Sequence, residues 1–252
     1  MSTETGQETF MSHLIELRTR LMRSIITVLV VFACLFPWAK DIYALLAAPL
    51  LGVLPQGASM IATDVTGTFL VPLKVTLMAA FLAALPVVLY QMWAFVAPGL
   101  YLHEKRLIVP LMVSSVVLFF VGMAFAYFVV FPVAFGFFAG YTPVGVQMMT
   151  DIDKYLSFVM AMFIAFGITF EVPVVLIVLV RLGVVSLDKL KEARPYTTVG
   201  AFIVAAVVTP PDVVSQLLLA IPLVLLYELG LLLARFVGKP VTAGVEVAGD
   251  KD

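Results

Sequence analysis

The sequence predicts an all-α membrane protein that crosses the bilayer six times and keeps both ends in the cytoplasm. Three observations predict this fold. Of the 252 residues, 63% are hydrophobic and only 12% are charged, and the mean hydropathy is +1.13, whereas a soluble domain is about half apolar and about a quarter charged. Apolar segments recur along the chain, and basic residues gather in alternate loops. So much apolar surface does not fit inside one core and must face lipid.

Six apolar segments are expected to form the spans. Their expected bounds are residues 24–38, 68–97, 107–131, 155–180, 196–208 and 213–234. A span needs about 20 apolar residues to cross about 30 Å of hydrocarbon, and the first four segments and the sixth are expected to do so. The fifth segment would reach only about 20 Å. It either thins the bilayer locally or pairs with the sixth as a shallow hairpin that turns at Pro210 and Pro211.

Basic residues predict the orientation, because Lys and Arg collect in cytoplasmic loops. They precede the first span, lie between the second and third and between the fourth and fifth, and follow the sixth, whereas the other loops hold only Lys40 and Lys154. Residues 1–240 are expected to form one transmembrane domain, and residues 241–252 a disordered cytoplasmic tail. Residues 41–56 are expected to form a short interfacial helix broken at Pro49.

Ionisable residues inside spans are costly and are functional candidates by default. Glu171 is the clearest case, because it lies two residues before Pro173, whose missing N–H loosens the helix. A carboxylate beside a helix break indicates a polar cavity rather than lipid. The alternative is a structural glutamate bonded to a neighbouring helix. Lys74 and Glu228 lie near span ends, where snorkelling to the interface is the simpler interpretation.

Two further acidic residues lie at the cytoplasmic surface. Residues 13–21 predict an amphipathic helix that enters the first span, in which Glu16 and Arg20 form an i,i+4 pair. The short loop after the second span holds Glu104 close to the membrane. The alternative for each acid is a local salt bridge, for Glu16 with Arg20 or with lipid headgroups.

Polar residues also gather before the sixth segment. Asp212 is placed to cap the sixth helix. Gln216 puts an amide inside a span, where it needs a hydrogen-bond partner.

The sequence offers no enzyme, metal or cofactor motif. Only two histidines and one cysteine are present, and His103 and Glu104 are followed at position 107 by Leu, where a zinc-protease motif requires His. Neither a phosphate-binding loop nor a nucleophile elbow occurs. We therefore expect no catalysis, no metal and no cofactor. The net charge of −1 gives no indication of a nucleic-acid partner, and none is expected.

Eight blocks of sequence resemble TatC, the multi-spanning subunit of the bacterial twin-arginine protein translocase, in its proteobacterial form. They are HLIELRTR (13–20), MIATD (60–64), YQMWAFVAP (90–98), LYLHEKR (100–106), AFAYFVVFP (124–132), YLSFVMAMFIAFGITFEVPV (155–174), RPY (194–196) and TPPDVVSQ (209–216). The resemblance runs from about residue 10 to residue 239. It implies six helices in a cupped-hand arrangement, with short fifth and sixth helices.

The resemblance also implies a function. TatC is the receptor for signal peptides that bear consecutive arginines, and it is the core subunit of the translocase. With the single-span subunits TatA and TatB, and with other copies of itself, it moves folded proteins across the cytoplasmic (inner) membrane, driven by the proton-motive force. A proton- or ion-coupled small-molecule transporter that uses Glu171 is the alternative. The lack of a visible inverted repeat stands against it.

Site residues follow from the resemblance by position. Glu16 and Glu104 match the places that bind the arginine pair, and Arg18 and Phe95 lie at the same surface. Glu171 matches a buried glutamate on the concave face. A periplasmic-side polar region that meets the partner helices is matched by Thr209, Asp212 and Gln216. A loop position linked to translocation is matched by Pro49.

Overall fold

Helices make up the whole of the described secondary structure in this computed structural model, apart from one isolated bridge between Ile61 and Asp151. The structure describes residues 4–51, 60–96, 108–141, 149–209 and 212–237. The elements are α1 (Glu4–Leu35), the 3₁₀ turn η1 (Phe36–Trp38), α2 (Ala39–Leu51), α3 (Gly67–Val96), α4 (Ile108–Phe125), the π-helical turn η4 (Ala126–Val130), α5 (Phe131–Gly140), α6 (Ile152–Arg181), α7 (Leu187–Glu192), α8 (Arg194–Val208) and α9 (Val213–Val237).

Five helical stretches in the described ranges are long and apolar enough to cross a membrane. They are Met11–Ala48, Gly67–Phe95, Val109–Gly140, Ile152–Arg181 and Val213–Phe236. The predicted all-α membrane fold is confirmed at this level. The fifth predicted segment is α8, whose 15 residues extend only about 22 Å. The sixth is α9, whose 25 residues are enough for a full span, so helix length does not confirm a short sixth helix. Six crossings and the single domain 1–240 stay predictions, and the tail 241–252 lies outside the described residues.

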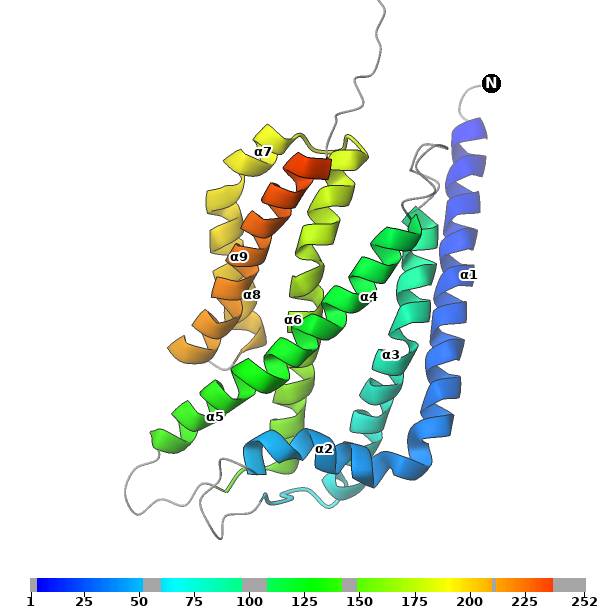
Figure 1. The fold of residues 1–252 in the computed structure, drawn as a ribbon. Helices are drawn as coiled ribbons and strands as arrows, with labels where there is room; N and C mark the ends of the chain where they lie inside the picture. Colours follow the sequence, from blue (N-terminus) through cyan, green and yellow to red (C-terminus); the bar gives the residue numbers. More distant parts are fainter. Residues whose placement is uncertain (1–3, 52–59, 97–107, 142–148, 210–211, 238–252) are drawn as a thin grey trace, which may run out of the picture.

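Helix α1 begins about 20 residues before the first predicted span, because the amphipathic segment 13–21 continues into the apolar run without a break. Figure 1 shows α1 running beside α3 along the length of the molecule. Helix α2 turns at η1 and lies across the end of the bundle that is opposite the start of α1. The stretch α4–η4–α5 crosses obliquely against α6, and α8 and α9 pack together on the other side of α6.

The predicted break at Pro49 is wrong. Helix α2 continues through Pro49 to Leu51. A proline inside a helix removes one N–H donor and leaves the carbonyl four residues earlier without its partner. In α2 that carbonyl belongs to Leu45, and the Tyr127 hydroxyl donates a hydrogen bond to it at 3.2 Å. Because a distant side chain satisfies the carbonyl, the helix does not have to end.

The third apolar segment also extends further than predicted, through Pro132 to Gly140. Five residues before Pro132 widen into the π-helical turn η4, in which the Phe131 N–H bonds the carbonyl of Ala126. Widening of this kind moves the backbone bonds off the regular ladder. The proline then begins α5 at a position where a missing N–H costs little.

Glycines allow the closest helix contacts, as is common between helices in lipid. A Cβ added at Gly122 of α4 would lie 2.6 Å from the carbonyl oxygen of Phe166 in α6. A Cβ at Gly230 of α9 would lie 2.9 Å from Cα of Pro173, also in α6. Helix α6 is therefore the central element, against which α4 and α9 pack backbone to backbone.

Replacement of Gly122 by Ala tests this packing. The added methyl group meets backbone, which does not rotate away, and overpacking of this kind costs about 1–3 kcal/mol. We expect a lower midpoint of thermal unfolding in detergent, followed by tryptophan fluorescence. Gly136→Ala is the matched control, because nothing lies within 4 Å of its added Cβ. An equal midpoint for the two variants would contradict the close contact.

Candidate binding surfaces

The N-terminal half of α1 is fixed to α3 through two pairs of side chains. The Glu16 Oε1 atom accepts hydrogen bonds from Arg20, at 2.9 Å from Nε and 2.6 Å from Nη2. Arg20 also reaches α3, where its Nη1 lies 3.4 Å from Oε1 of Gln91. One turn nearer the N-terminus, the His13 ring stacks on Phe95 with 4.3 Å between centroids. The predicted residues Glu16 and Phe95 therefore belong to one surface.

The local interpretation of Glu16 is also correct, since the predicted i,i+4 pair with Arg20 forms. Both side chains keep part of their surface in solvent, and both hydrogen bonds from Arg20 end on Oε1. Arg18 is exposed and lies about 200° around the helix from Glu16. Glu104 lies outside the described residues, so its distance from Glu16 stays a prediction.

Glu171 lies in the middle of α6, between Pro173 and the indole–hydroxyl pair of Trp93 and Ser115. Trp93 Nε1 donates to Ser115 Oγ at 3.1 Å, and the Ser115 hydroxyl neighbours the Glu171 carboxyl group. The Oε1 atom of Glu171 is buried and has no hydrogen-bond partner in the part of the chain that the structure describes. A buried carboxylate oxygen left in this way is costly. Glu171 is therefore not explained as a fully bonded structural residue.

The N-terminal end of α9 carries the third predicted group. Asp212 caps this helix as predicted, because its Oδ1 accepts the Ser215 N–H at 2.7 Å. Gln216 Nε2 donates to the carbonyl of Phe202 in α8 at 3.2 Å, and the buried Thr209 hydroxyl bonds the carbonyl of Ala205 at 2.8 Å. The amide predicted to need a partner thus finds one on the neighbouring helix of the same chain.

Two polar atoms beside this cap remain unpaired. Asp212 Oδ2 and Ser215 Oγ are buried without a hydrogen-bond partner among the described residues. Ser215 was not predicted from the sequence, although a serine in the first apolar turn after Asp212 was a visible signal. Together with Gln216, these atoms give the α8–α9 end of the molecule an unusual density of polar groups at the level of a span.

Another polar network at the same end of the bundle ties the segment before α3 to the start of α6. Asp151 Oδ1 caps α6 through the N–H groups of Asp153 and Lys154, and Oδ2 accepts from the Thr63 N–H at 3.1 Å and from its hydroxyl. These hydrogen bonds, the Thr63 hydroxyl foremost, lower the pKa of Asp151 to about 2. Lys74 bonds Asp153 at 2.7 Å. The network is structural, since the described donors and acceptors are matched within the chain.

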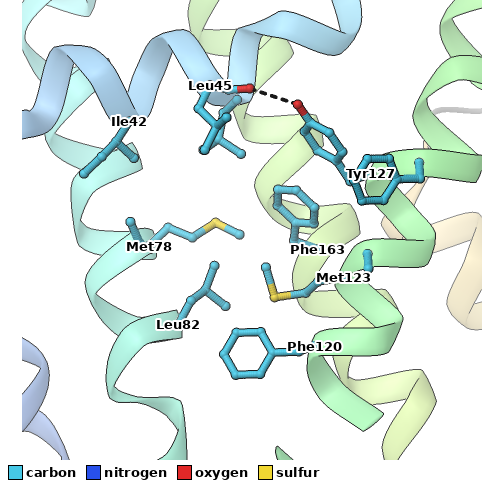
Figure 2. Close-up of a pocket in the computed structure, with 12 residues that line it drawn as sticks. Ile42, Leu45, Met78, Leu82, Phe120, Met123, Tyr127 and Phe163 are labelled. Carbon is cyan, nitrogen blue, oxygen red and sulfur yellow. Dashed lines mark hydrogen bonds between the residues drawn. The ribbon is translucent and has the colours of Figure 1, made fainter. Parts of the chain in front are cut away.

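Tyr127 and Tyr155 donate hydrogen bonds to carbonyl groups of α2. Tyr127 donates to the Leu45 carbonyl that Pro49 leaves free, as Figure 2 shows. Tyr155 donates to the next carbonyl, that of Leu46, at 2.9 Å. Neither tyrosine was identified from the sequence, because each hydroxyl is about 80 or more residues away in the chain from the carbonyl to which it donates. Pro49 thus acts on α2 through the hydrogen bond that it makes necessary.

The described residues define a class of protein: a polytopic, helical membrane protein with an acid at one end of the bundle, a buried acid that has one unpaired oxygen among these residues, and a polar patch at the other end. In the described residues no three His, Cys, Asp or Glu side chains converge on a metal site. The sequence model of the family described as Sec-independent protein translocase protein (TatC) matches residues 12–222. The chain belongs to the TatC family.

Individual relatives agree with this assignment. The Sec-independent protein translocase protein TatC of Escherichia coli (strain K12) is 57% identical over 240 residues, 95% of this chain and 93% of the relative. The TatC protein of Azotobacter chroococcum mcd 1 is 59% identical over 219 residues, 87% and 86% of the two chains. A crystal structure described as the twin arginine translocase receptor TatC superposes with a TM-score of 0.80 at 42% identity, covering 89% of this chain and 99% of that one.

The link between Pro49 and Tyr127 is testable by a double-mutant cycle. Tyr127→Phe leaves the Leu45 carbonyl without a partner and should destabilise the protein by about 1 kcal/mol. Pro49→Ala restores an N–H to α2, which can bond the Leu45 carbonyl within the helix. In that background we therefore expect Tyr127→Phe to cost clearly less, as measured by unfolding in detergent.

Tyr155→Phe is the matched control for this cycle. Its acceptor, the Leu46 carbonyl, is not the one that Pro49 frees. The cost of Tyr155→Phe should be the same in the Pro49→Ala background as in the unaltered protein. Strictly additive effects of Pro49→Ala and Tyr127→Phe would show that the two residues act independently.

Proposed function

We propose that the chain is the signal-peptide receptor and core subunit of a twin-arginine translocase in the bacterial cytoplasmic membrane. It binds signal peptides with consecutive arginines and, with the single-span partners TatA and TatB and further copies of itself, exports folded proteins on the proton-motive force. The single observation that carries this proposal is the Glu16 surface. There an acid at the end of a span is held beside Phe95 by contacts between α1 and α3, in a chain of the TatC family.

Paired carboxylates explain a preference for paired arginines. A guanidinium group stays charged and forks onto a carboxylate with two parallel hydrogen bonds, which lysine does not do. Both bonds from Arg20 end on Oε1 of Glu16, so Oε2 is the oxygen that an arriving arginine uses. Glu104 takes the second arginine. Arg18, on nearly the opposite side of α1 from Glu16, repels peptides that present basic residues away from the two acids.

Six crossings are supported by two bonds that tie α8 to α9. At the start of α8 Arg194 bonds Glu228 at 2.6 Å, and in the middle of α8 the Phe202 carbonyl accepts a hydrogen bond from Gln216. Helix α8 thus runs along α9, and it crosses the membrane where α9 crosses. Its length of about 22 Å requires the bilayer to thin locally. Both termini then lie in the cytoplasm, as the basic residues indicate.

The polar end of α8–α9 is the docking site for a partner helix. Asp212 Oδ2 and Ser215 Oγ are buried and have no partner in the described chain, so a partner helix reaches them by displacing the side chains that cover them. Thr209 and Gln216 flank these atoms. Interhelical hydrogen bonds of this kind help single-span helices associate in lipid. Glu171 is the intramembrane acid used during transport, and Pro49 acts in translocation rather than in binding, through its effect on α2.

Loss of the acids should abolish recognition. In the variant Glu16→Ala with Glu104→Ala, we expect no crosslinking between the protein in membrane vesicles and a twin-arginine signal peptide that carries a photoreactive group. The membrane level of the protein should not change, because the Glu16 side chain is partly solvated and Glu104 is predicted to lie in a loop at the membrane surface. The matched control is Glu192→Ala, which removes an exposed acid of α7. Unchanged crosslinking in the double variant would remove the proposed binding site.

The partner surface has a separate test in Gln216→Leu and Ser215→Ala. Both should weaken co-purification of a single-span partner in mild detergent and leave signal-peptide crosslinking unchanged. Gln216→Leu also breaks the bond to α8, whereas Ser215→Ala removes an unpaired hydroxyl and should not lower the thermal midpoint. Loss of partner binding only in variants with a lower midpoint would mean that the patch is structural.

A further inference from the structure

A large apolar pocket opens between four elements in the interior half of the bundle next to α2. Its volume is about 430 Å³. It is lined by side chains of α2, α3, the α4–η4 stretch and α6, of which Ile42, Leu45, Met78, Leu82, Phe120, Met123, Tyr127 and Phe163 are labelled in Figure 2. None of the residues assigned above to signal-peptide or partner binding lines it. We propose that this pocket binds one acyl chain of a membrane lipid.

Water is a poor occupant of this space. A buried water molecule needs about two to four polar partners, and the lining is apolar except for the Tyr127 hydroxyl. That hydroxyl already donates to the Leu45 carbonyl at the rim of the pocket, as the dashed line in Figure 2 shows. A dry apolar space must be filled by hydrocarbon if its walls are to keep their dispersion contacts.

The pocket is continuous with the surface that faces lipid. Its mouth is formed by exposed side chains, with Leu45 exposed by 66% and Phe128 by 73%, whereas Met78 and Phe163 at the back are exposed by only 7% and 3%. Residues of three membrane spans form the side walls. A lipid beside the protein therefore reaches the pocket from within the bilayer, without passing any polar barrier.

The size of the pocket decides between an acyl chain and a helix. One helical turn with its side chains is about 10 Å across and 5.4 Å long, or roughly 400 Å³. The empty space between the walls is about 950 Å³, open solvent included, so the pocket holds no more than about two such turns, and α2 closes one end of it. The apolar segment of a signal peptide or a partner span is several turns long and does not fit. A single acyl chain is narrow and flexible, and the thioethers of Met78 and Met123 adapt to its shape.

Photolabelling in a bilayer tests the proposal. The protein is reconstituted in vesicles of phosphatidylethanolamine and phosphatidylglycerol that contain a phosphatidylglycerol with a diazirine on one acyl chain. After irradiation, labelled residues are located by mass spectrometry. We expect adducts at Met78 and Phe163, which are too buried for lipid on the outer surface to reach. Labelling confined to exposed residues would overturn the proposal.

Variants that fill the pocket sharpen this test. Ala79→Trp and Ala124→Trp place an indole at two different walls, and labelling of Met78 and Phe163 should fall roughly tenfold or more, because no room is left for the chain. Ala83→Trp is the matched control, an exposed position of α3 that does not line the pocket, and it should label like the unaltered protein. Equal labelling in all three variants would overturn the proposal.

Two further results are decisive. Ala124 is exposed at the mouth, so Ala124→Trp decides the outcome should Ala79→Trp fail to fold, with the thermal midpoint of Ala83→Trp as reference. A twin-arginine signal peptide with a diazirine in its apolar segment serves as the competing probe. If this peptide labels Phe163 and the lipid does not, the pocket belongs to the peptide and the lipid proposal is wrong.

Discussion

Polar atoms inside a bilayer have no water to bond, so each of them must find a partner in protein. The described helices obey this constraint mainly through their own backbone bonds, and side chains serve groups that the helices leave free. The Tyr127 hydroxyl serves the carbonyl freed by Pro49, and Gln216 serves a carbonyl of α8. The atoms that do not obey it within the described residues include Glu171 Oε1, Asp212 Oδ2 and Ser215 Oγ. Since an unpaired buried atom costs about 1–3 kcal/mol, these atoms mark the places where the packing of the chain is least favourable.

This constraint separates the molecule into parts with different tasks. The surface around Glu16 is partly solvated, so its charges are cheap to maintain and free to exchange partners. The α8–α9 end buries its unpaired atoms inside the chain, so a partner must displace the side chains that cover them. Between them, Gly122 and Gly230 let helices touch α6 backbone to backbone. The recognition and the assembly proposed above therefore use opposite ends of a closely packed middle.

Hydropathy was sufficient to predict the spans, because lipid leaves few alternatives to a long apolar helix. The bounds of α3, α6 and α8 lie within about three residues of the prediction. The prolines were harder. Pro49 was expected to break α2 and does not, and Pro132 lies inside a continuous helical stretch. The effect of a proline depends on whether Tyr127 or a π-helical turn serves the backbone, and neither is visible in local sequence.

Among the site residues too, contacts within one helix were predicted and contacts between helices were not. The pair of Glu16 with Arg20 and the cap by Asp212 follow from spacing of three or four residues, which a helix brings together whatever its surroundings. The stacking of His13 on Phe95 and the unpaired Ser215 hydroxyl depend on how whole helices pack. Resemblance to the TatC family pointed to Phe95 but not to its stacking on His13, and nothing in the sequence predicted the pocket next to α2. Contacts between residues of one helix could thus be predicted from the sequence, and contacts between helices could not.

The Glu16–Arg20 pair also bears on how a receptor of this kind achieves selectivity. Arg20 already bonds Oε1 of the Glu16 carboxylate, which a substrate arginine must share, and this lowers the net free energy gained from binding any single guanidinium group. Exposed ion pairs are worth only about 0–1 kcal/mol, so displacing or sharing Arg20 costs little, but one new contact gains little as well. Appreciable affinity then requires a second carboxylate that engages a second arginine on the same peptide, because the two contacts share one loss of translational freedom. A weak, pre-paired acid at the surface is thus a physical reason for a signal of two consecutive arginines rather than one.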